Sequence, residues 1–376
     1  MTGLALYLHI PFCVRKCFYC DFNSGPAGEE AREAYVETLC REIRQSPWSG
    51  QPARTVFFGG GTPSELTVAQ LGRINDQLRE SFRPEPDAEW TIETNPGTVT
   101  PESLAGMRQI GFNRISLGVQ SFHDHHLKAI GRIHTADEAR RAFCWAEEAG
   151  FGSRNLDLIF GLPNQTLDEW AADLRVTLSL RPEHISLYGL IVEEKTEFGR
   201  RHAAGRLPLP DEDSVADMYE MTLDRLAMAG YHQYEISNFA LPEHDCRHNQ
   251  VYWRNEPYLG FGISAASFMD GERWSNTPST RDYRERVAAG LSAAEPGERL
   301  EGRSAVGEAL MLMLRLNEGA DLMEMSDRYG CDVKALFSTE FQRSVDYGLL
   351  AWVPGGRLRL TRRGLLLSNN VFADLI

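Results

Sequence analysis

Residues 9–22 read HIPFCVRKCFYCDF and place Cys13, Cys17 and Cys20 in a CxxxCxxC run behind a short apolar stretch. Three thiolates at this spacing converge only if the chain wraps around one object, and soft thiolates in that number usually hold a cube of iron and sulfide. A structural zinc site would need a fourth Cys or His at matched spacing, but Phe22 stands where a further cysteine would follow. The run therefore predicts an iron–sulfur cluster with one iron open to a substrate or cofactor. Three unrelated buried cysteines are the alternative.

A glycine triplet, FFGGGTPS at residues 57–64, is the second motif. Glycine triplets by themselves are often simple turns. This one ends an apolar run and precedes a helical pattern, so its backbone amides could approach the amino or carboxylate group of a ligand with no Cβ in the way. Beside the cysteine run, it favours a ligand site over a turn.

The first half of the chain alternates short apolar strands with amphipathic helices. The pattern predicts strands at 4–10, 55–58, 89–94, 114–119, 152–160 and 184–190, and helices at 29–45, 67–82, 101–110, 135–149 and 166–180. Pro101 suits a helix start, Gly150 suits a helix end, and Thr166 with Glu169 forms a capping-box pattern. Six strand–helix units with short connections predict an α/β fold, in which a parallel sheet curls into an open (β/α)6 partial barrel with its helices outside.

Polar side chains recur where these strands end. Glu93 closes the third predicted strand, Gln120 follows the fourth, and Asp157 lies on the fifth. Carboxylates suit ribose hydroxyls or an ammonium group, whereas the amide of Gln120 and the guanidinium of Arg132 suit ribose, a carboxylate or a substrate. Each residue alone could be surface solvation, and Arg132 could be a solvated helix end. Ligand sites in such sheets lie at the C-terminal ends of the strands. The location of these polar residues at one edge of the sheet therefore favours a shared site.

Composition and charge limit the classes of function. The chain has 376 residues, of which 42% are apolar and 24% charged, as in a globular protein of one large and one smaller unit. The net charge of −14 argues against a nucleic-acid partner, although arginines near the C-terminus leave a local basic patch open. We expect no signal peptide and no membrane span, since no run of about 20 apolar residues occurs. Seven cysteines, three of them committed to one cluster, suit a reducing compartment, so we expect a cytoplasmic protein.

Several segments together resemble one branch of the radical S-adenosylmethionine (SAM) superfamily, the coproporphyrinogen dehydrogenase-like proteins. They extend from about residue 4 to 270 and include HIPFCVRKCFYC, FFGGGTP, TIETNP, RISLGVQSF, IGRIH, NLDLIFGLP and SLYGL. The resemblance implies that Cys13, Cys17 and Cys20 hold a [4Fe–4S] cluster whose fourth iron chelates the amino and carboxylate groups of SAM. Carried over by position, it also implies adenine contact at Leu190 and a SAM site at Tyr7, Tyr19, Gly60, Gly61, Thr62, Glu93, Gln120, Arg132 and Asp157.

The branch contains two kinds of protein, and the chain departs from one of them. Oxygen-independent coproporphyrinogen oxidases carry a further cysteine where Phe22 stands, together with an N-terminal extension for which the sequence before Cys13 leaves no room. Residues 246–253 instead read CRHNQVYW, and this HNxxYW motif resembles that of the haem chaperones of the branch. We therefore expect a haem carrier rather than a coproporphyrinogen-oxidising enzyme.

The HNxxYW motif is chemically suited to contact haem. A neutral imidazole such as that of His248 is a common axial haem ligand, and Tyr252 and Trp253 could stack on a porphyrin face. Cys246 offers an alternative thiolate ligand. The competing interpretation is that His248 forms hydrogen bonds within the core and that the aromatic residues simply pack.

The resemblance also implies a division of the chain and a function. We expect a radical SAM core at 1–235, a connector with the haem motif at 236–300, and a small α+β domain of the HemN C-terminal kind at 301–376. Residues 231–300 are rich in aromatic residues and show no regular period, so we expect irregular structure there. The expected function is a haem chaperone that uses a [4Fe–4S] cluster, SAM and haem, and delivers haem to an acceptor protein. An oxygen-independent coproporphyrinogen III dehydrogenase is the alternative, so whether the chain is an enzyme stays open. A membrane-associated acceptor and a homodimer also stay open.

Overall fold

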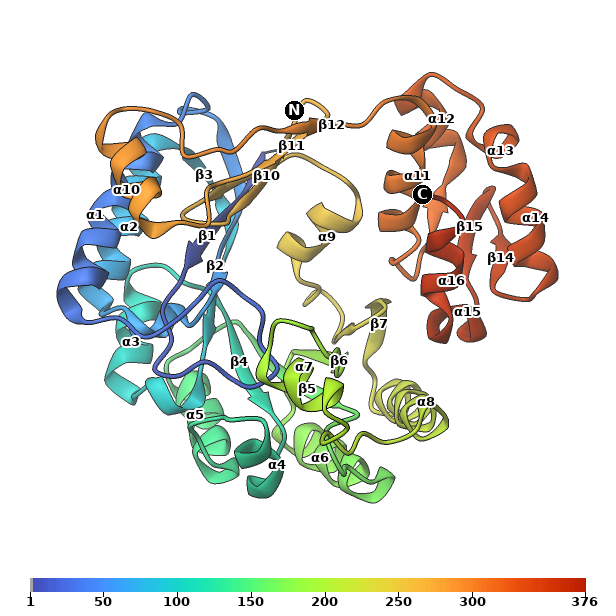
Figure 1. Cartoon of the computed structure of the whole chain (residues 1–376), viewed down its shortest axis with the longest axis horizontal. Helices are drawn as coiled ribbons and strands as arrows, with labels where there is room; N and C mark the ends of the chain where they lie inside the picture. Colours follow the sequence, from blue (N-terminus) through green and yellow to red (C-terminus); the bar gives the residue numbers. More distant parts are fainter. Residues whose placement is uncertain (1–2) are drawn as a thin grey trace.

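Six parallel strands form the centre of the structure, a computed structural model that describes residues 3–376 (Figure 1). Each strand lies next to the one that precedes it in the chain. In this register Tyr7 lies beside Phe57, and Phe57 beside Thr91, so the C-terminal ends of the strands meet at one edge. The predicted curled parallel sheet is therefore confirmed, with strands β1 (Leu4–Ile10), β2 (Pro52–Gly60), β3 (Arg83–Thr94), β4 (Arg114–Gln120), β5 (Ser153–Phe160) and β6 (His184–Gly189).

The helices that follow these strands cover the outer face of the sheet (Figure 1). Four of them begin with a capping box at a threonine. The threonine hydroxyl accepts a hydrogen bond from the backbone N–H three residues later, and the side chain of that later residue accepts one from the backbone N–H of the threonine. The capping box predicted for Thr166 and Glu169 is one of these. Their apolar faces bury Leu39, Leu71 and Leu104 against the sheet. They are α1 (Glu29–Gln45), α2 (Val68–Ser81), α3 (Pro101–Gln109), α4 (Asp124–Ala129), α5 (Ala136–Glu148) and α6 (Leu167–Leu180).

The sheet continues beyond the six expected strands at both edges. One end adds β9, which is parallel to β1, and then an antiparallel ribbon, whereas the other adds two antiparallel strands beside β6. The expectation of irregular structure over 231–300 was therefore wrong. These strands are too short to show a clear alternation of apolar and polar residues. They form because they pair with neighbouring strands of the sheet. They are β7 (His232–Glu235), β8 (Asn238–Ala240), β9 (Tyr258–Phe261), β10 (Ala266–Met269), β11 (Glu272–Ser275) and β12 (Glu298–Arg299).

Helix α9 (Arg247–Trp253), which carries the HNxxYW motif, lies within the curve of the sheet (Figure 1). Behind it, the side chain of Phe57 from β2 packs with Tyr234, Ala240 and Cys246 in a small buried cluster. Other helices of this half are α7 (Glu197–Ala203), α8 (Glu212–Met228) and α10 (Thr280–Ala288).

The C-terminal part has a hydrophobic core of its own, which includes Leu310, Phe337 and Phe341. Its strands form a small antiparallel sheet in which a hairpin around 354–356 joins β14 to β15. Its elements are α11 (Gly302–Met313), β13 (Ala320–Asp321), α12 (Leu322–Tyr329), α13 (Val333–Leu336), α14 (Ser338–Asp346), β14 (Leu350–Val353), β15 (Arg357–Leu360), α15 (Arg362–Leu366) and α16 (Ser368–Ala373).

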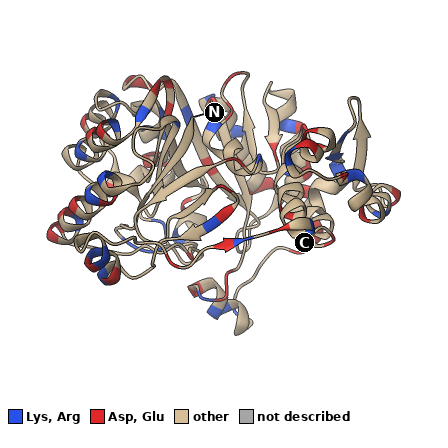
Figure 2. Cartoon of the chain, turned by 90° about the horizontal axis from the view of Figure 1, so that it is seen from above, with Lys and Arg blue, Asp and Glu red and all other residues tan. Residues whose placement is uncertain are grey.

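Charged side chains of both signs are interspersed over the outer helices (Figure 2). The arginines near the C-terminus do not stand alone: Arg362 pairs with Glu220 and Asp224, and Arg343 pairs with Asp374. These ion pairs offset the local positive charge of the C-terminal stretch. Among the described residues, no helix combines the length and the apolar character needed to cross a membrane.

Candidate functional site

A cavity of about 400 Å³ opens at the C-terminal ends of the parallel strands. Its walls come from the C-terminal parts of β2 to β6 and from the loops that follow β1 to β4 and β6, which is where a parallel sheet usually presents ligand-binding residues. Of the residues predicted for the cluster and SAM, the structure brings these to the cavity: Cys13, Cys17, Cys20, Tyr19, Gly60, Gly61, Thr62, Glu93, Gln120, Arg132, Asp157 and Leu190. Tyr7 does not line it, and its hydroxyl instead lies 3.1 Å from Nδ1 of His9.

The cysteine loop is held by backbone hydrogen bonds at both ends. Cys13 N donates to the carbonyl of Gly25 (3.1 Å), and Gly25 N donates to that of Pro11 (3.0 Å). Farther on, Phe18 N donates to the carbonyl of Ile130 (3.0 Å), which ties the loop to the segment after α4. The three thiols therefore face one cavity because the loop that carries them is anchored, and not because the cysteines pack in a core.

The chemistry of these donors fits a [4Fe–4S] cluster. Three thiols face the cavity, and the side chain of Phe22, at the position of a further cysteine, is 60% exposed. Burial raises the pKa of the Cys20 thiol to about 11, so an iron cation is needed to deprotonate it. Arg132 Nη1 lies 3.5 Å from Cys17 Sγ and places a positive charge beside a sulfur that would become a thiolate.

The glycine triplet makes space for close backbone packing. Gly60 has a φ of 103°, and a Cβ on Gly61 would lie 2.7 Å from the carbonyl oxygen of Phe12. Gly61 N and Thr62 N donate to the carbonyls of Ile10 and Phe12 at 2.8 and 2.7 Å. These two N–H groups are therefore engaged by the chain that leads into the cysteine loop, and contact of the glycine backbone with a ligand stays a prediction.

Two carboxylates lie on the cavity wall. Asp157 accepts hydrogen bonds from Ser116 Oγ and Asn155 Nδ2, each at 2.8 Å, and Glu93 accepts one from Gly60 N at 3.3 Å. Burial, together with the negative charge of Asp157, raises the pKa of Glu93 to about 8, and burial also raises that of Asp157. A cationic or hydroxyl-bearing ligand would compensate this charge, as the prediction of ribose or ammonium contacts requires.

Gln120 adopts a left-handed backbone with a φ of 70°, at an irregularity in the pairing of β4 with β5. Such strain in a residue other than glycine is typical of positions where a site demands one orientation. The neighbouring Gly118 leaves room for Arg132, whose Nη2 donates to the Gly118 carbonyl. Sequence reasoning missed Gly118, although an isolated glycine in a strand often signals such a close approach.

Other lining residues were also missing from the predicted site. Some of them lie at the ends of the same strands, and this position could have identified them from the sequence. The residues of the cysteine loop carry no such sequence signal. The missed residues include Lys16, Ser24, Thr94, Ile159 and Ile191.

The HNxxYW motif lies apart from this cavity, and His248 is 1% exposed. Its Nδ1 lies 2.8 Å from Thr55 Oγ1, its Nε2 lies 2.9 Å from the Tyr252 hydroxyl, and its ring stacks on Phe57 at 4.9 Å. Burial lowers the pKa of His248 to about 3, so the ring is neutral. In this conformation neither ring nitrogen is free to bind haem iron, and the role of His248 as a ligand stays a prediction.

In the rest of the motif, Tyr252 packs against β9 and Trp253 against the C-terminal part. Tyr252 meets Tyr258 edge to face at 4.7 Å, and the Arg315 guanidinium lies 4.4 Å from the Trp253 ring. Trp253 Nε1 is buried without a hydrogen-bond partner. Cys246 is buried, and burial raises the pKa of its thiol to about 12, which disfavours a thiolate ligand in this state.

Comparison with known proteins places the chain in a family. Residues 7–176 match the radical SAM superfamily, and residues 301–367 match the HemN C-terminal domain. The chain is 37% identical over 373 residues to the heme chaperone HemW of Bacillus subtilis (strain 168), covering 98% of each. It is 43% identical over 290 residues to that of Escherichia coli (strain K12), covering 76% of this chain and 75% of the relative.

A solved structure of similar fold is coproporphyrinogen III oxidase (HemN) from Escherichia coli, described as a radical SAM enzyme. Its TM-score is 0.85 at 27% sequence identity, and the match covers 99% of this chain and 90% of that one. This likeness extends over both the curled sheet and the C-terminal part. Together with the relatives that align from end to end, it shows that the chain belongs to the radical SAM superfamily and, within it, to the HemW family.

Proposed function

We propose that this chain is a haem chaperone, which binds haem and passes it to an acceptor protein, and that it carries a [4Fe–4S] cluster and SAM. The observation that carries the proposal is the match to the heme chaperone HemW of Bacillus subtilis over 98% of both chains. An alignment of that extent includes the cysteine run, the strand-end residues and the HNxxYW motif. The exposed Phe22, in place of a further cysteine, agrees with it.

Membership of the radical SAM superfamily implies the cluster and SAM. We assign the cluster to Cys13, Cys17 and Cys20, and SAM to the cavity beside them. When bound, the cluster with its open iron chelates SAM and can supply it with an electron. The chain contributes the carboxyl groups of Glu93 and Asp157, which suit ammonium and hydroxyl groups.

The same cavity has an apolar end, where Leu190 packs with Tyr19 and the buried Ile159. A flat adenine is a suitable occupant of such a surface. Arg132 adds a positive charge beside Cys17. The cavity thus presents two carboxyl groups, an apolar surface and three thiols, which together match the parts of SAM.

We place haem contact at α9. This assignment requires His248 to leave Thr55 and Tyr252, because both of its ring nitrogens are engaged. Tyr252 and Trp253 are half-buried and lie between the sheet and the C-terminal part, so a modest movement of α9 would bring them to a flat ligand. Haem binding would then be coupled to a local rearrangement of α9.

The test is an anaerobic haem titration of the cluster-loaded protein, with His248→Ala and His184→Ala as a matched pair. His184 is equally buried and its ring nitrogens are also engaged, with Asn155 at 2.7 Å and Tyr234 at 2.8 Å, but it lies outside the motif. We expect a saturable one-to-one shift of the Soret band in the wild type and in His184→Ala, and an altered shift in His248→Ala. Absent or unsaturable binding in the wild type would refute the chaperone proposal, whereas equal behaviour of the two variants would refute only the place of the site.

A coproporphyrinogen III dehydrogenase is the second candidate, favoured by the structural likeness to HemN. Its test is product analysis with coproporphyrinogen III, SAM and a strong reductant under anaerobic conditions. Because of Phe22, we expect no decarboxylated product. Appearance of harderoporphyrinogen or protoporphyrinogen would favour the enzyme.

We further propose that the chain acts in the cytoplasm. All seven cysteines are free in the structure, which suits a reducing compartment. The acceptor and a homodimer are tested by crosslinking the haem-loaded protein in cell extract, with the haem-free protein as the control. A crosslinked product that depends on haem would identify the acceptor, and a product of twice the chain mass would support the homodimer.

A further inference from the structure

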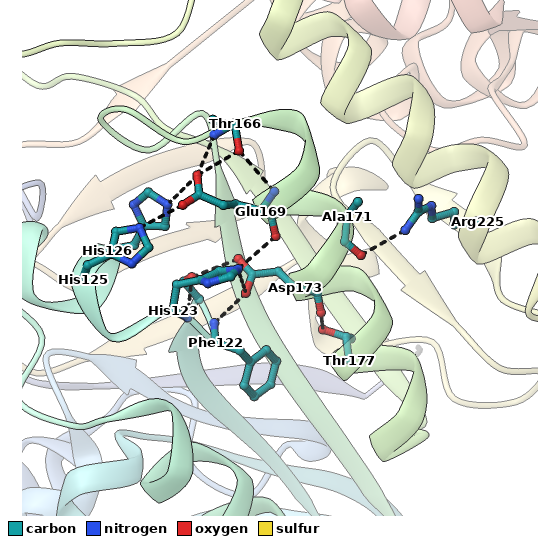
Figure 3. Close-up of polar contacts among 11 residues, drawn as sticks. Phe122, His123, His125, His126, Thr166, Glu169, Ala171, Asp173, Thr177 and Arg225 are labelled. Carbon is teal, nitrogen blue, oxygen red and sulfur yellow. Dashed lines mark hydrogen bonds and ion pairs between the residues drawn. The ribbon is translucent and has the colours of Figure 1, made fainter.

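A group of histidines and a carboxylate lies outside the cavity, between α4 and the first turn of α6 (Figure 3). His125 Nε2 lies 3.0 Å from Glu169 Oε1, and His126 Nε2 lies 3.4 Å from Glu169 Oε2. The donor atoms of all three residues lie within 4.8 Å of one another. Over residues 3–376, no other group of three histidine, cysteine or acidic side chains meets that spacing.

The buried member of the group has an unsatisfied ring nitrogen. His126 is 1% exposed, and its Nε2 has no hydrogen-bond partner although it is aimed at Glu169. Buried polar atoms are nearly always satisfied, so an orphaned nitrogen needs an explanation. A metal ion between the imidazole and the carboxylate would accept its lone pair.

Glu169 is held in one orientation by the cap of α6. Its Oε2 accepts hydrogen bonds from Thr166 N at 2.9 Å and Thr166 Oγ1 at 3.0 Å, which leaves Oε1 facing His125. The cap of α6 therefore fixes the carboxylate with one oxygen directed at each histidine.

The segment that leads into α4 is fixed by Asp173. Phe122 N and Ser121 Oγ donate to the Asp173 carboxylate at 2.7 and 2.9 Å, and His123 Nε2 lies 3.1 Å from the Glu169 carbonyl (Figure 3). His123 is thus committed to the support of the loop. His125, by contrast, has a side chain that is 61% exposed, so the group opens to solvent and an ion can reach it.

We propose that His125, His126 and Glu169 bind a divalent transition-metal ion, best matched by Zn²⁺, with water in the fourth position. Zinc bonds of 2.0–2.2 Å in a tetrahedron hold ligand atoms about 3.4 Å apart, close to the separations above. Two imidazoles and one carboxylate suit zinc, copper or nickel, whereas calcium and magnesium prefer oxygen ligands. The ion would link α4 to α6, and because α4 lies between Gln120 and Arg132 in the chain, it would steady the loop that carries both.

The test is zinc binding by the cluster-loaded protein under anaerobic conditions, so that the three cysteines are already occupied. Glu169→Gln is the main variant, because glutamine still caps the helix but loses the charge. His126→Ala removes the buried ligand. The matched control is His232→Ala: His232 pairs with Asp245 at 2.7 Å but belongs to no group of three.

We expect one zinc ion per chain in the wild type and in His232→Ala by titration calorimetry and elemental analysis. X-ray absorption at the zinc edge should show only nitrogen and oxygen neighbours. Glu169→Gln and His126→Ala should each weaken binding at least about 10-fold, and zinc should raise the melting temperature of the wild type but not of Glu169→Gln. Sulfur neighbours, no saturable zinc, or equal affinity in wild type and Glu169→Gln would overturn the proposal.

Discussion

Gly60→Ala tests whether the end of β2 is built for close packing under the cavity. The residue has a φ of 103°, and an added Cβ would lie 2.5 Å from both Cε1 and Nδ1 of His9. An L-residue in such a conformation costs about 1–3 kcal/mol. His9 is buried, and its ring contacts the Asn23 carbonyl and the Tyr7 hydroxyl, each at 3.1 Å. If both hydrogen bonds are lost, about 0.5–1.5 kcal/mol is added for each, so we expect the free energy of unfolding to fall by about 2–6 kcal/mol.

The matched control is Gly72→Ala on α2. A Cβ there would meet only Ile110 Cγ2, at an ordinary 3.6 Å, and alanine favours a helix by about 0.5–1 kcal/mol over glycine. Both variants are measured by urea denaturation with circular dichroism, and SAM affinity by equilibrium dialysis of the cluster-loaded protein. We expect Gly60→Ala to lose stability and SAM binding, and Gly72→Ala to lose neither. A Gly60→Ala protein as stable as the wild type, with unchanged SAM affinity, would refute the steric argument.

Three further outcomes follow from buried polar groups. Asp157→Asn should weaken SAM binding about 10- to 150-fold in equilibrium dialysis, since a charge-assisted contact is worth about 1.5–3 kcal/mol; unchanged affinity would remove Asp157 from the site. Thr55→Val should lower the free energy of unfolding by about 1–3 kcal/mol in urea, because it leaves Nδ1 of His248 unpaired; a neutral change would mean that the ring finds another partner. Burial raises the pKa of Glu42 to about 7, above its usual 4.5, so its stabilising effect is complete below about pH 4.5 and is lost as the pH rises through 7. The slope is at most about 1.4 kcal/mol per pH unit, and Glu42→Gln should flatten it in denaturation curves recorded from pH 5 to 8; an unchanged slope would exclude Glu42 as its source.

Much of the cofactor site could be predicted because its signals are local. The CxxxCxxC spacing, the glycine triplet and the strand-end positions of Glu93 and Asp157 are each read from a few consecutive residues. Parallel strands then bring their C-terminal ends together without further information. Helix boundaries were also well predicted, since threonine caps and apolar periodicity are properties of a single segment.

What the tertiary structure alone decided rests on contacts between distant segments. The short strand β9 forms because it pairs with β1, and its four residues alone do not indicate a strand. From the sequence, His248 of the HNxxYW motif could serve as a haem ligand. In the structure its Nδ1 is engaged by Thr55 on β2. In the same way, His125 and His126 become a candidate metal site only because α6 brings Glu169 to them. The sequence by itself therefore determined the six central strands, the helices between them and the spacing of the three cysteines. Only folding decided which histidine nitrogens are free, because each hydrogen-bond partner comes from another part of the chain.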